Sequence, residues 1–314
     1  MRQFAKPTIV VSKCLEFDAC RYNGEMIPDV TIRNLQPFVT FIPVCPEVEI
    51  GLGTPRETIR IVEENGENRL VQPSTREDVT EKMEQFSNDF LQTIPDVDGF
   101  ILKNRSPSCG TRDVKIYSGF EKAPAKGKGA GLFGGAVVKN FSHLPIEEEG
   151  RLSNFIIREH FFTRLFTIAY YKMIKHNKNM KELVSFQSDN KYLFMAYNQV
   201  KQKELGRIIA NQKNEKIEVV FENYEKTLYE LFMRAPRYTS NVNVCEHIFG
   251  YFKTKLKKQE KDHFIELLQK YAEKKIPLSS LLTILKSWAI RFDEKYLLRQ
   301  TYFEPYPEAL VEIS

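Results

Sequence analysis

Three of the five cysteines follow segments that are typical of buried β-strands. Cys14 follows PTIVVSK, Cys45 follows FVTFIPV, and Cys109 follows GFILKN after a short polar turn. In an open α/β sheet, ligands bind beyond the carboxyl ends of the strands, where the order of the strands reverses. We therefore expect the three thiols, although far apart in the sequence, to meet at one point.

Thiolates gathered at one point repel each other, and a metal is the usual way to compensate their charge. Soft sulfur ligands favour zinc or an iron-sulfur cluster. A structural zinc site needs four ligands, and neither Cys20 nor a histidine stands at a characteristic spacing. A 4Fe-4S cluster held by three cysteines would leave one iron open as a Lewis acid. The alternative, three separately buried cysteines that act as small hydrophobic residues, stays open at this point.

Two residues near these cysteines have side chains suited to acid-base chemistry. Glu47 stands two positions after Cys45, and Ser106 stands three positions before Cys109. A carboxylate beside a Lewis acid can act as a general base, and a hydroxyl can orient water or relay a proton. The alternatives are a solvated loop glutamate and a hydroxyl that caps a turn.

The pattern of apolar residues predicts two domains, residues 1–175 and residues 176–314. In the first, short β-rich runs alternate with stretches long enough for helices, which predicts an α/β fold: a Rossmann-like parallel sheet covered by helices on both faces. Thr75 and Asp78 resemble a capping box at the start of one of these helices. The predicted strands lie at 7–13, 38–44, 58–62 and 98–104.

The second domain is predicted to be all-α, because its apolar residues recur with the spacing of amphipathic helices. Pro236 and Pro277 end two of the helical segments. We expect some of these segments to be broken into two helices. They lie at 191–212, 215–235, 243–275 and 279–300.

Charge and cysteine use indicate a cytosolic protein without a membrane partner. The odd number of cysteines does not suggest a secreted disulfide framework, and the first apolar run is too short and too charged for a signal peptide. Residues 1–175 contain 23 basic and 23 acidic side chains, whereas residues 176–314 contain 23 and 18, so the formal charge of +5 belongs to the second domain.

Several basic residues are candidates for phosphate contacts. The glycine-rich segment 126–135 contains Lys126 and Lys128, and its backbone N–H groups could surround a phosphate, although a plain loop is the alternative. Three arginines follow the cysteine-containing segments and are further candidates, with surface ion pairs as the alternative. They are Arg21, Arg56 and Arg112.

A basic stripe in the second domain is a candidate RNA-binding surface. Lys253, Lys257 and Lys261 recur every four residues beside Tyr251 and Phe252. A solvated helix face is the alternative, whereas the net charge of this domain favours contacts with a phosphate backbone.

The segments around the three cysteines resemble those of the thiouracil desulfidase family. The resemblance rests on SKCLEFDACRYNGE, FIPVCPEVEIGLGTPRETIRIV and LKNRSPSCG. The second half, with LGRIIAN, NVCEHIFGYF and YLLRQTYFEPYP, is similar to the helical domain fused to that enzyme in bacterial tRNA 4-thiouridine desulfidases. The resemblance covers nearly the whole chain, in the same order.

This resemblance implies a function and a set of site residues. Cys14, Cys45 and Cys109 match the ligands of a 4Fe-4S cluster, and Glu47 and Ser106 match the catalytic glutamate and serine. The implied reaction replaces the sulfur of 4-thiouridine in tRNA by oxygen without net redox change. Two alternatives stay open: a desulfidase of free thiouracil or thiolated nucleotides, and a non-catalytic metal-containing RNA-binding protein.

Overall fold

The computed structural model describes residues 2–120, 124–211 and 214–312 and divides the chain into two compact units. The first unit comprises the chain up to Ala169 together with the segment that begins at Ala309, and the second runs from Tyr170 to Glu308. The division falls inside helix α6 (Phe155–Asn177), which also contains the predicted boundary at residue 175.

The first unit is built on a four-stranded parallel sheet, which confirms the predicted α/β class. The strand order is β2 (Thr40–Val44), β1 (Thr8–Ser12), β6 (Gly99–Leu102) and β9 (Ile146–Glu148). After β2, the chain returns past β1 to form β6. The order of the strands therefore reverses between β1 and β6, and a crevice forms at that point in doubly wound sheets.

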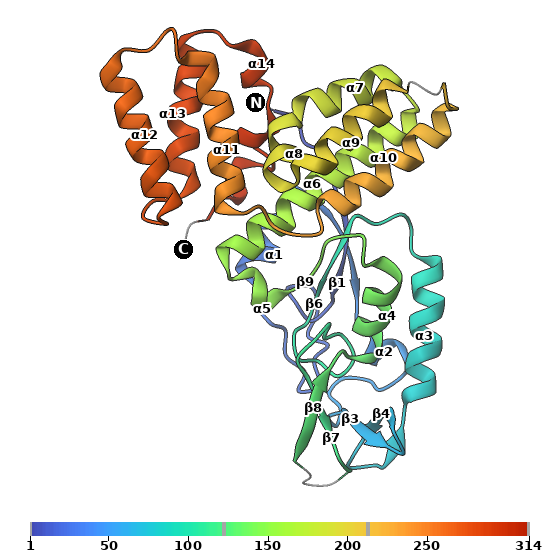
Figure 1. Cartoon of the computed structure of the whole chain (residues 1–314). Helices are drawn as coiled ribbons and strands as arrows, with labels where there is room; N and C mark the ends of the chain where they lie inside the picture. The colour runs from blue at the N-terminus through green and yellow to red at the C-terminus, as the bar shows by residue number, and fades with distance from the viewer. Residues whose placement is uncertain (1, 121–123, 212–213, 313–314) are drawn as a thin grey trace. The chain divides into compact units, whose positions relative to one another are not determined.

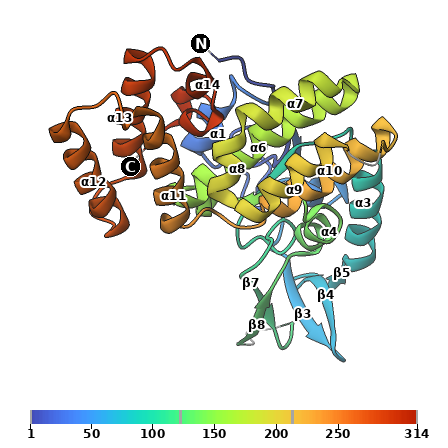
Figure 2. The same ribbon diagram turned by 45° about the horizontal axis from the view of Figure 1, so that its top comes forward.

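Helices cover both faces of this sheet, because right-handed crossovers that run in opposite directions lie on opposite faces. Helix α1 (Val30–Leu35) connects β1 to β2. Helix α3 (Thr80–Thr93) lies in the connection from β2 to β6, and α4 (Leu132–Phe141) lies in the connection from β6 to β9. The two helices lie side by side in both views (Figures 1 and 2). The central strands are buried on both sides, which explains their continuous apolar runs.

A second sheet of five strands lies between β2 and α4 in the sequence. Its order is β5 (Glu77–Asp78), β4 (Glu67–Gln72), β3 (Arg60–Glu64), β7 (Val114–Tyr117) and β8 (Ala125–Gly129). The predicted strand at 58–62 thus belongs to a separate sheet and not to the parallel one, because β3 pairs with β4 in an antiparallel hairpin. The β7–β8 hairpin leads directly into α4.

The predicted capping box at Thr75 is wrong. The Thr75 hydroxyl donates to the side chain of Gln72 at 2.8 Å, whereas Asp78 accepts a hydrogen bond from the backbone of Thr80 at 2.8 Å. Helix α3 therefore begins at Thr80, because the preceding residues pair with β4 as strand β5.

The second unit consists of helices, as predicted. Asn198 breaks the first predicted segment in two by accepting hydrogen bonds from the backbone N–H groups of Val200 and Lys201, both at 3.1 Å. A single aromatic core that includes Tyr171, Phe194 and Trp288 joins the helices. Residue 212, the end of that first segment, lies outside the described residues. The helices are α7 (Met180–Asp189), α8 (Lys191–Tyr197), α9 (Gln199–Ala210), α10 (Ile217–Leu231), α11 (Tyr238–Phe249), α12 (Lys258–Ala272), α13 (Leu278–Arg291) and α14 (Lys295–Leu298).

Within the described ranges, none of these helices combines the length and the apolar character that a membrane crossing requires.

Candidate active site

The three candidate cluster ligands lie at the carboxyl ends of three adjacent strands. Cys14 follows β1 by two residues, Cys45 directly follows β2, and Cys109 lies in the loop after β6. Because β1 lies between β2 and β6, these ends share one edge of the sheet. Cys45 and Cys109 are buried, with 8% and 5% of their surface exposed, and Cys14 is half-buried.

Burial is the main reason why the pKa values of two of these thiols are raised. Burial, and then the charge of Cys45, raise the pKa of Cys14 to about 12. Burial also raises the pKa of Cys109; a hydrogen bond with Ser12 opposes the rise, and the charges of Cys14 and Cys45 add to it. The thiols of Cys14 and Cys109 therefore stay neutral unless a cation compensates the charge that they would carry as thiolates.

This donor set fits a thiolate-bound cofactor in its chemistry, since three soft, mutually repelling sulfur atoms need such a cation. Across the part of the chain that the structure describes, no group of three or more His, Cys, Asp or Glu side chains is already arranged to hold a metal ion. The role of the three cysteines as ligands thus stays a prediction.

The structure also brings Cys20 next to Cys45. The Sγ atom of Cys45 lies 3.8 Å from the carbonyl oxygen of Cys20. Burial, followed by the charge of Cys45 and a hydrogen bond with its side chain, raises the pKa of Cys20 to about 12. The sequence showed no characteristic metal-ligand spacing for Cys20, and its position beside a candidate ligand depends on the fold of the loop between β1 and α1.

Arg56 holds the carboxylate of Glu47, the candidate general base. The arginine Nε donates to Oε2 of Glu47 at 2.9 Å, and its Nη2 lies 2.7 Å from the same oxygen. Its Nη1 donates to the carbonyl oxygens of Cys20 and Gly53 at 2.9 and 2.8 Å. The side chain of Arg56 is only 4% exposed. The structure therefore contradicts the prediction that Arg56 contacts a phosphate, because its donors are committed to groups within the protein.

The other carboxylate oxygen of Glu47 accepts a hydrogen bond from Ser108. The Ser108 hydroxyl lies 2.6 Å from Oε1 of Glu47 and 2.9 Å from the hydroxyl of Ser106. Since the Ser108 proton goes to the carboxylate, Ser106 must donate to Ser108. The Ser106 oxygen in turn accepts from the backbone N–H groups of Cys109 at 3.1 Å and Ser108 at 3.3 Å. The predicted catalytic serine thus reaches Glu47 through a second serine.

The loop that carries both serines rests on the first turn of α4. The backbone N–H groups of Gly131 and Gly134 donate to the carbonyl oxygens of Gly110 at 2.7 Å and Ser108 at 2.9 Å. A Cβ atom added at Gly134 would lie 2.3 Å from the carbonyl oxygen of Gly110. The glycines therefore allow close packing of loop and helix. The N–H groups of Gly131 and Gly134 thus already have partners within the protein. A phosphate contact of the rest of segment 126–135 stays a prediction.

Comparison with known proteins identifies the family. Residues 9–149 match a family model described as 2-thiouracil desulfurase. The uncharacterized protein YbbK of Bacillus subtilis is 36% identical over 118 residues, which cover 35% of this chain and 77% of YbbK. The chain belongs to the 2-thiouracil desulfurase family. We call residues 9–149 the desulfurase domain; the candidate cysteines, Glu47 and both serines lie inside it.

Other comparisons concern the helical part and the fold. Residues 191–307 match a family of unknown function, DUF1722. The uncharacterized protein YbgA of Escherichia coli is 22% identical over 149 residues, or 47% of this chain and 88% of YbgA. A solved structure of a 4Fe-4S-dependent thiouracil desulfidase, TudS, is 24% identical and covers 47% of this chain and 94% of its own. Its TM-score of 0.36 is too low to equate the two folds.

The remaining basic candidates of the desulfurase domain are surface residues with acidic neighbours. The four do not form one cluster: Lys126 pairs with Glu63 and Lys128 with Asp113, whereas Arg21 and Arg112 lie in other loops. Arg21 lies 3.8 Å from Glu25, and Arg112 lies 3.5 Å from Glu147. Of these four, only Lys128 lines the cavity described next.

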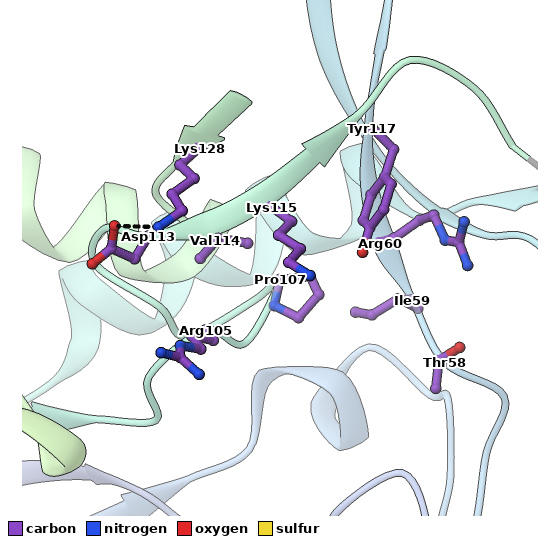
Figure 3. A pocket seen from close by; sticks show the side chains of 10 residues that line it. All are labelled: Thr58, Ile59, Arg60, Arg105, Pro107, Asp113, Val114, Lys115, Tyr117 and Lys128. Carbon is purple, nitrogen blue, oxygen red and sulfur yellow. Dashed lines mark hydrogen bonds and ion pairs between the residues drawn. The ribbon is translucent and has the colours of Figure 1, made fainter. Parts of the chain in front are cut away.

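A cavity of about 510 Å³ borders the serine loop and was not predicted from the sequence (Figure 3). Pro107, between the two serines, forms part of its wall. Its basic residues include Arg60, Arg105 and Lys115. In the sequence, Lys115 is a polar residue between the apolar Val114 and Ile116. This local signal does not reveal which strands lie beside Lys115.

The predicted helical stripe in the second unit is wrong in its geometry. Helix α11 ends at Phe249, a 3-10 turn spans Gly250–Phe252, and α12 begins only at Lys258. Lys253 and Lys257 therefore lie in the connection, and only Lys261 is on α12. Lys253 and Lys257 are exposed, and Lys261 is half-buried. Their contact with RNA stays a prediction.

Proposed function

We propose that this protein removes the sulfur of 4-thiouridine in tRNA, replacing C=S by C=O in a non-redox hydrolysis. The observation that carries the proposal is the hydrogen-bonded series Ser106, Ser108 and Glu47, which adjoins the buried Cys109 within a 2-thiouracil desulfurase domain. A proton acceptor, a proton relay and a candidate ligand for a thiophilic metal thus occur together.

Cys14, Cys45 and Cys109 are the residues that would hold a 4Fe-4S cluster, whose open iron would act as a Lewis acid toward the thiocarbonyl sulfur. The relative named TudS is described as dependent on such a cluster. In the overall reaction, water supplies the oxygen and two protons, and the sulfur leaves as hydrogen sulfide. No electrons are exchanged.

Glu47 is suited to accept a proton from the attacking water. Its Oε2 is held by Arg56, which fixes the carboxylate, and its Oε1 keeps one lone pair beyond the bond from Ser108. General-base catalysis of this kind contributes about 10²- to 10⁴-fold to a rate. The Ser108 hydroxyl would pass a proton between Glu47 and Ser106, so that Ser106 orients the water or protonates the leaving group.

The choice of tRNA as the substrate rests on the helical unit. The excess of basic residues belongs to residues 176–314, and a polyanion would be attracted to such a domain. The name of the matching family favours a second candidate, free 2-thiouracil or a small thiolated nucleotide, because it refers to the base alone.

The test is sulfide release by anaerobically purified protein from three substrates: tRNA that contains 4-thiouridine, 4-thiouridine monophosphate, and 2-thiouracil. We expect the highest kcat/KM with tRNA, and a loss of about 10²- to 10⁴-fold in the Glu47→Gln variant. Preference for either small substrate would favour the second candidate. Binding of tRNA without sulfide release from any substrate would leave the non-catalytic RNA-binding protein.

Binding to tRNA provides a separate test of the helical unit. Variants in which Lys253, Lys257 and Lys261 are all replaced by Gln should bind tRNA more weakly, with a shallower dependence on salt concentration. An affinity that does not change with salt would rule out phosphate-backbone contacts as its main source.

A further inference from the structure

The cavity beside the serine loop has the size and the shape of a small-ligand site. Its volume of about 510 Å³ lies within the range of about 300–1,000 Å³ that is usual for ligand pockets. Strands β3 and β7 and the segments that contain Thr58, Arg105 and Pro107 form its wall. Figure 3 shows Arg105 and Thr58 on opposite sides of the cavity, with Lys115 between them.

Three basic residues form a row across neighbouring strands of the second sheet. Lys115 of β7 is directly opposite Lys128 of β8. On the other side, Ile61 of β3 is paired with Ile116 of β7, so Arg60, one residue earlier, is level with Lys115. Like charges opposite each other in a sheet destabilise it. Negative charge nearby would therefore stabilise the directly opposed Lys115 and Lys128.

Among the described residues, one ion pair supplies negative charge to the two opposed lysines. Asp113 lies 3.4 Å from Lys128 in an exposed pair, and exposed pairs contribute only about 0–1 kcal/mol. Arg60 lies over the ring of Tyr117 at 4.8 Å. Within the described ranges, neither Lys115 nor Arg105 forms an ion pair. The lining thus has four basic residues and one acidic residue, Asp113.

Arg105 connects this basic cavity to the candidate active site. It is the residue before Ser106, and its φ of 55° places it in the left-handed region that side chains rarely adopt. Such a conformation costs about 1–3 kcal/mol, so a surrounding structure has to hold it. Here the next residues form the loop that is bonded to α4. A ligand that occupies the cavity therefore lies against Pro107, between the two serines.

We propose that this cavity binds a phosphate ester of the substrate nucleotide, while the thiolated base enters the adjacent site at Ser106 and Glu47. This inference rests on the proposed function and deepens it, because it assigns the phosphate of the substrate nucleotide to a particular cavity and to particular residues. Lys115 and Arg105 are the residues that bind the phosphate. Lysine and arginine are the usual partners of phosphate oxygens, and an anion relieves the repulsion in the row.

The first experiment measures binding and does not depend on catalysis. Calorimetric titration of the full-length protein compares uridine, uridine 5′-monophosphate and the trinucleotide UpUpU. We expect both phosphate-containing ligands to bind at least about tenfold more tightly than uridine, and Lys115→Gln to reduce that difference about five- to tenfold. Stronger binding of the monophosphate assigns the site to free nucleotides, and stronger binding of UpUpU assigns it to the phosphodiesters of RNA. Equal affinities for uridine and both phosphate-containing ligands would overturn the proposal.

Matched variants separate this role from a loss of folding. Lys139→Gln removes the same charge from an exposed residue of α4 outside the cavity and should change nothing. Lys115→Arg should keep most of the phosphate-dependent affinity. If Lys115→Gln weakens uridine as much as the monophosphate, Lys115 does not bind the phosphate and the proposal fails.

A second experiment distinguishes this proposal from the proposed function. With an active enzyme, Lys115→Gln and Arg105→Gln should raise KM for thiolated nucleotides about five- to tenfold and leave KM for the free thiolated base unchanged. A protein that prefers the monophosphate but releases no sulfide would refute the desulfidase and keep the phosphate site. A protein that releases sulfide equally well from base and nucleotide would refute the phosphate site alone.

Discussion

Ser108 donates a 2.6 Å hydrogen bond to Glu47, a residue 61 positions earlier in the chain. The bond joins the loop after β6 to the short helix after β2, α2 (Pro46–Glu49), at the edge where the parallel strands end. It also makes Ser108, and not only Ser106, a direct neighbour of the candidate base.

Replacing Ser108 by Ala should lower kcat about 10- to 100-fold, because it interrupts the series of hydroxyls and frees Oε1 of Glu47, at a cost of about 1–3 kcal/mol. Steady-state sulfide release measures the effect. Ser106→Ala is expected to lower kcat as well, and the double variant should be little worse than either single variant. Fully additive losses would show that the two serines act independently.

Arg56→Met should destabilise the protein by about 3–5 kcal/mol, because the carboxylate of Glu47, only 12% exposed, loses its ion-pair partner. Urea unfolding provides the measurement. Adding Glu47→Gln to this variant should restore part of the loss. Arg33→Met is the matched control: its ion pair with Glu16 is exposed on the arginine side, so its removal should cost less than about 1 kcal/mol. Equal costs for both arginines would contradict the role given to Arg56.

Removal of any one of Cys14, Cys45 or Cys109 should abolish iron binding and the broad visible absorbance of anaerobically purified protein. Cys245→Ser is the control, since this thiol lies in the core of the helical unit. Metal analysis and absorbance measure the outcome.

Cys20→Ser tests whether three cysteines suffice. If Cys14, Cys45 and Cys109 are the complete set of ligands, this variant keeps its iron despite the proximity of Cys20 to Cys45. A colourless Cys20→Ser protein with normal folding would make Cys20 a fourth ligand and remove the open iron from the mechanism.

Two adjacent glycines of α4 should respond differently to the same change. Alanine is favoured over glycine inside helices by about 1 kcal/mol. Gly135→Ala should therefore be neutral or stabilising, because the nearest atom to its new Cβ is the Cβ of Ala130, at 3.4 Å. Gly134→Ala should destabilise the protein and lower activity, because its Cβ would lie 2.4 Å from the carbonyl oxygen of Cys109. Thermal unfolding of the two variants compares them; similar midpoints would mean that the loop does not depend on this contact.

His160 should make the stability of the protein fall at mildly acidic pH. Burial, with a smaller contribution from Arg164, lowers the pKa of His160 to about 4 from the model-peptide value of 6.5. Between these values the unfolded chain binds a proton that the folded chain does not, so stability is complete above pH 6.5 and decreases toward pH 4. The slope from this group is at most about 1.4 kcal/mol per pH unit.

The measurement is urea unfolding of the wild type and His160→Gln at several pH values between 4 and 7. The variant should lose less stability than the wild type as the pH falls. Parallel curves for the two proteins would mean that His160 titrates normally in the folded state.

The sequence by itself determined the elements whose signals are local. The apolar runs before Cys14, Cys45 and Cys109 predicted strands β1, β2 and β6, because a strand that is buried on both faces has a continuous apolar run. The spacing of apolar residues predicted a helical second half, because a helix that is buried along one stripe repeats its apolar residues at that spacing. The position of each cysteine relative to its strand followed directly from adjacency in the chain.

The tertiary structure decided everything that depends on pairing between distant residues. Pairing of β5 with β4, and not the local motif at Thr75, set the start of α3. Arg56 could be assigned to Glu47 only once the loop after β2 was folded. Lys115, Lys128 and Arg60 became one row only through the register of three strands. Strand register and loop packing arise from long-range contacts, so no local pattern of residues contains them.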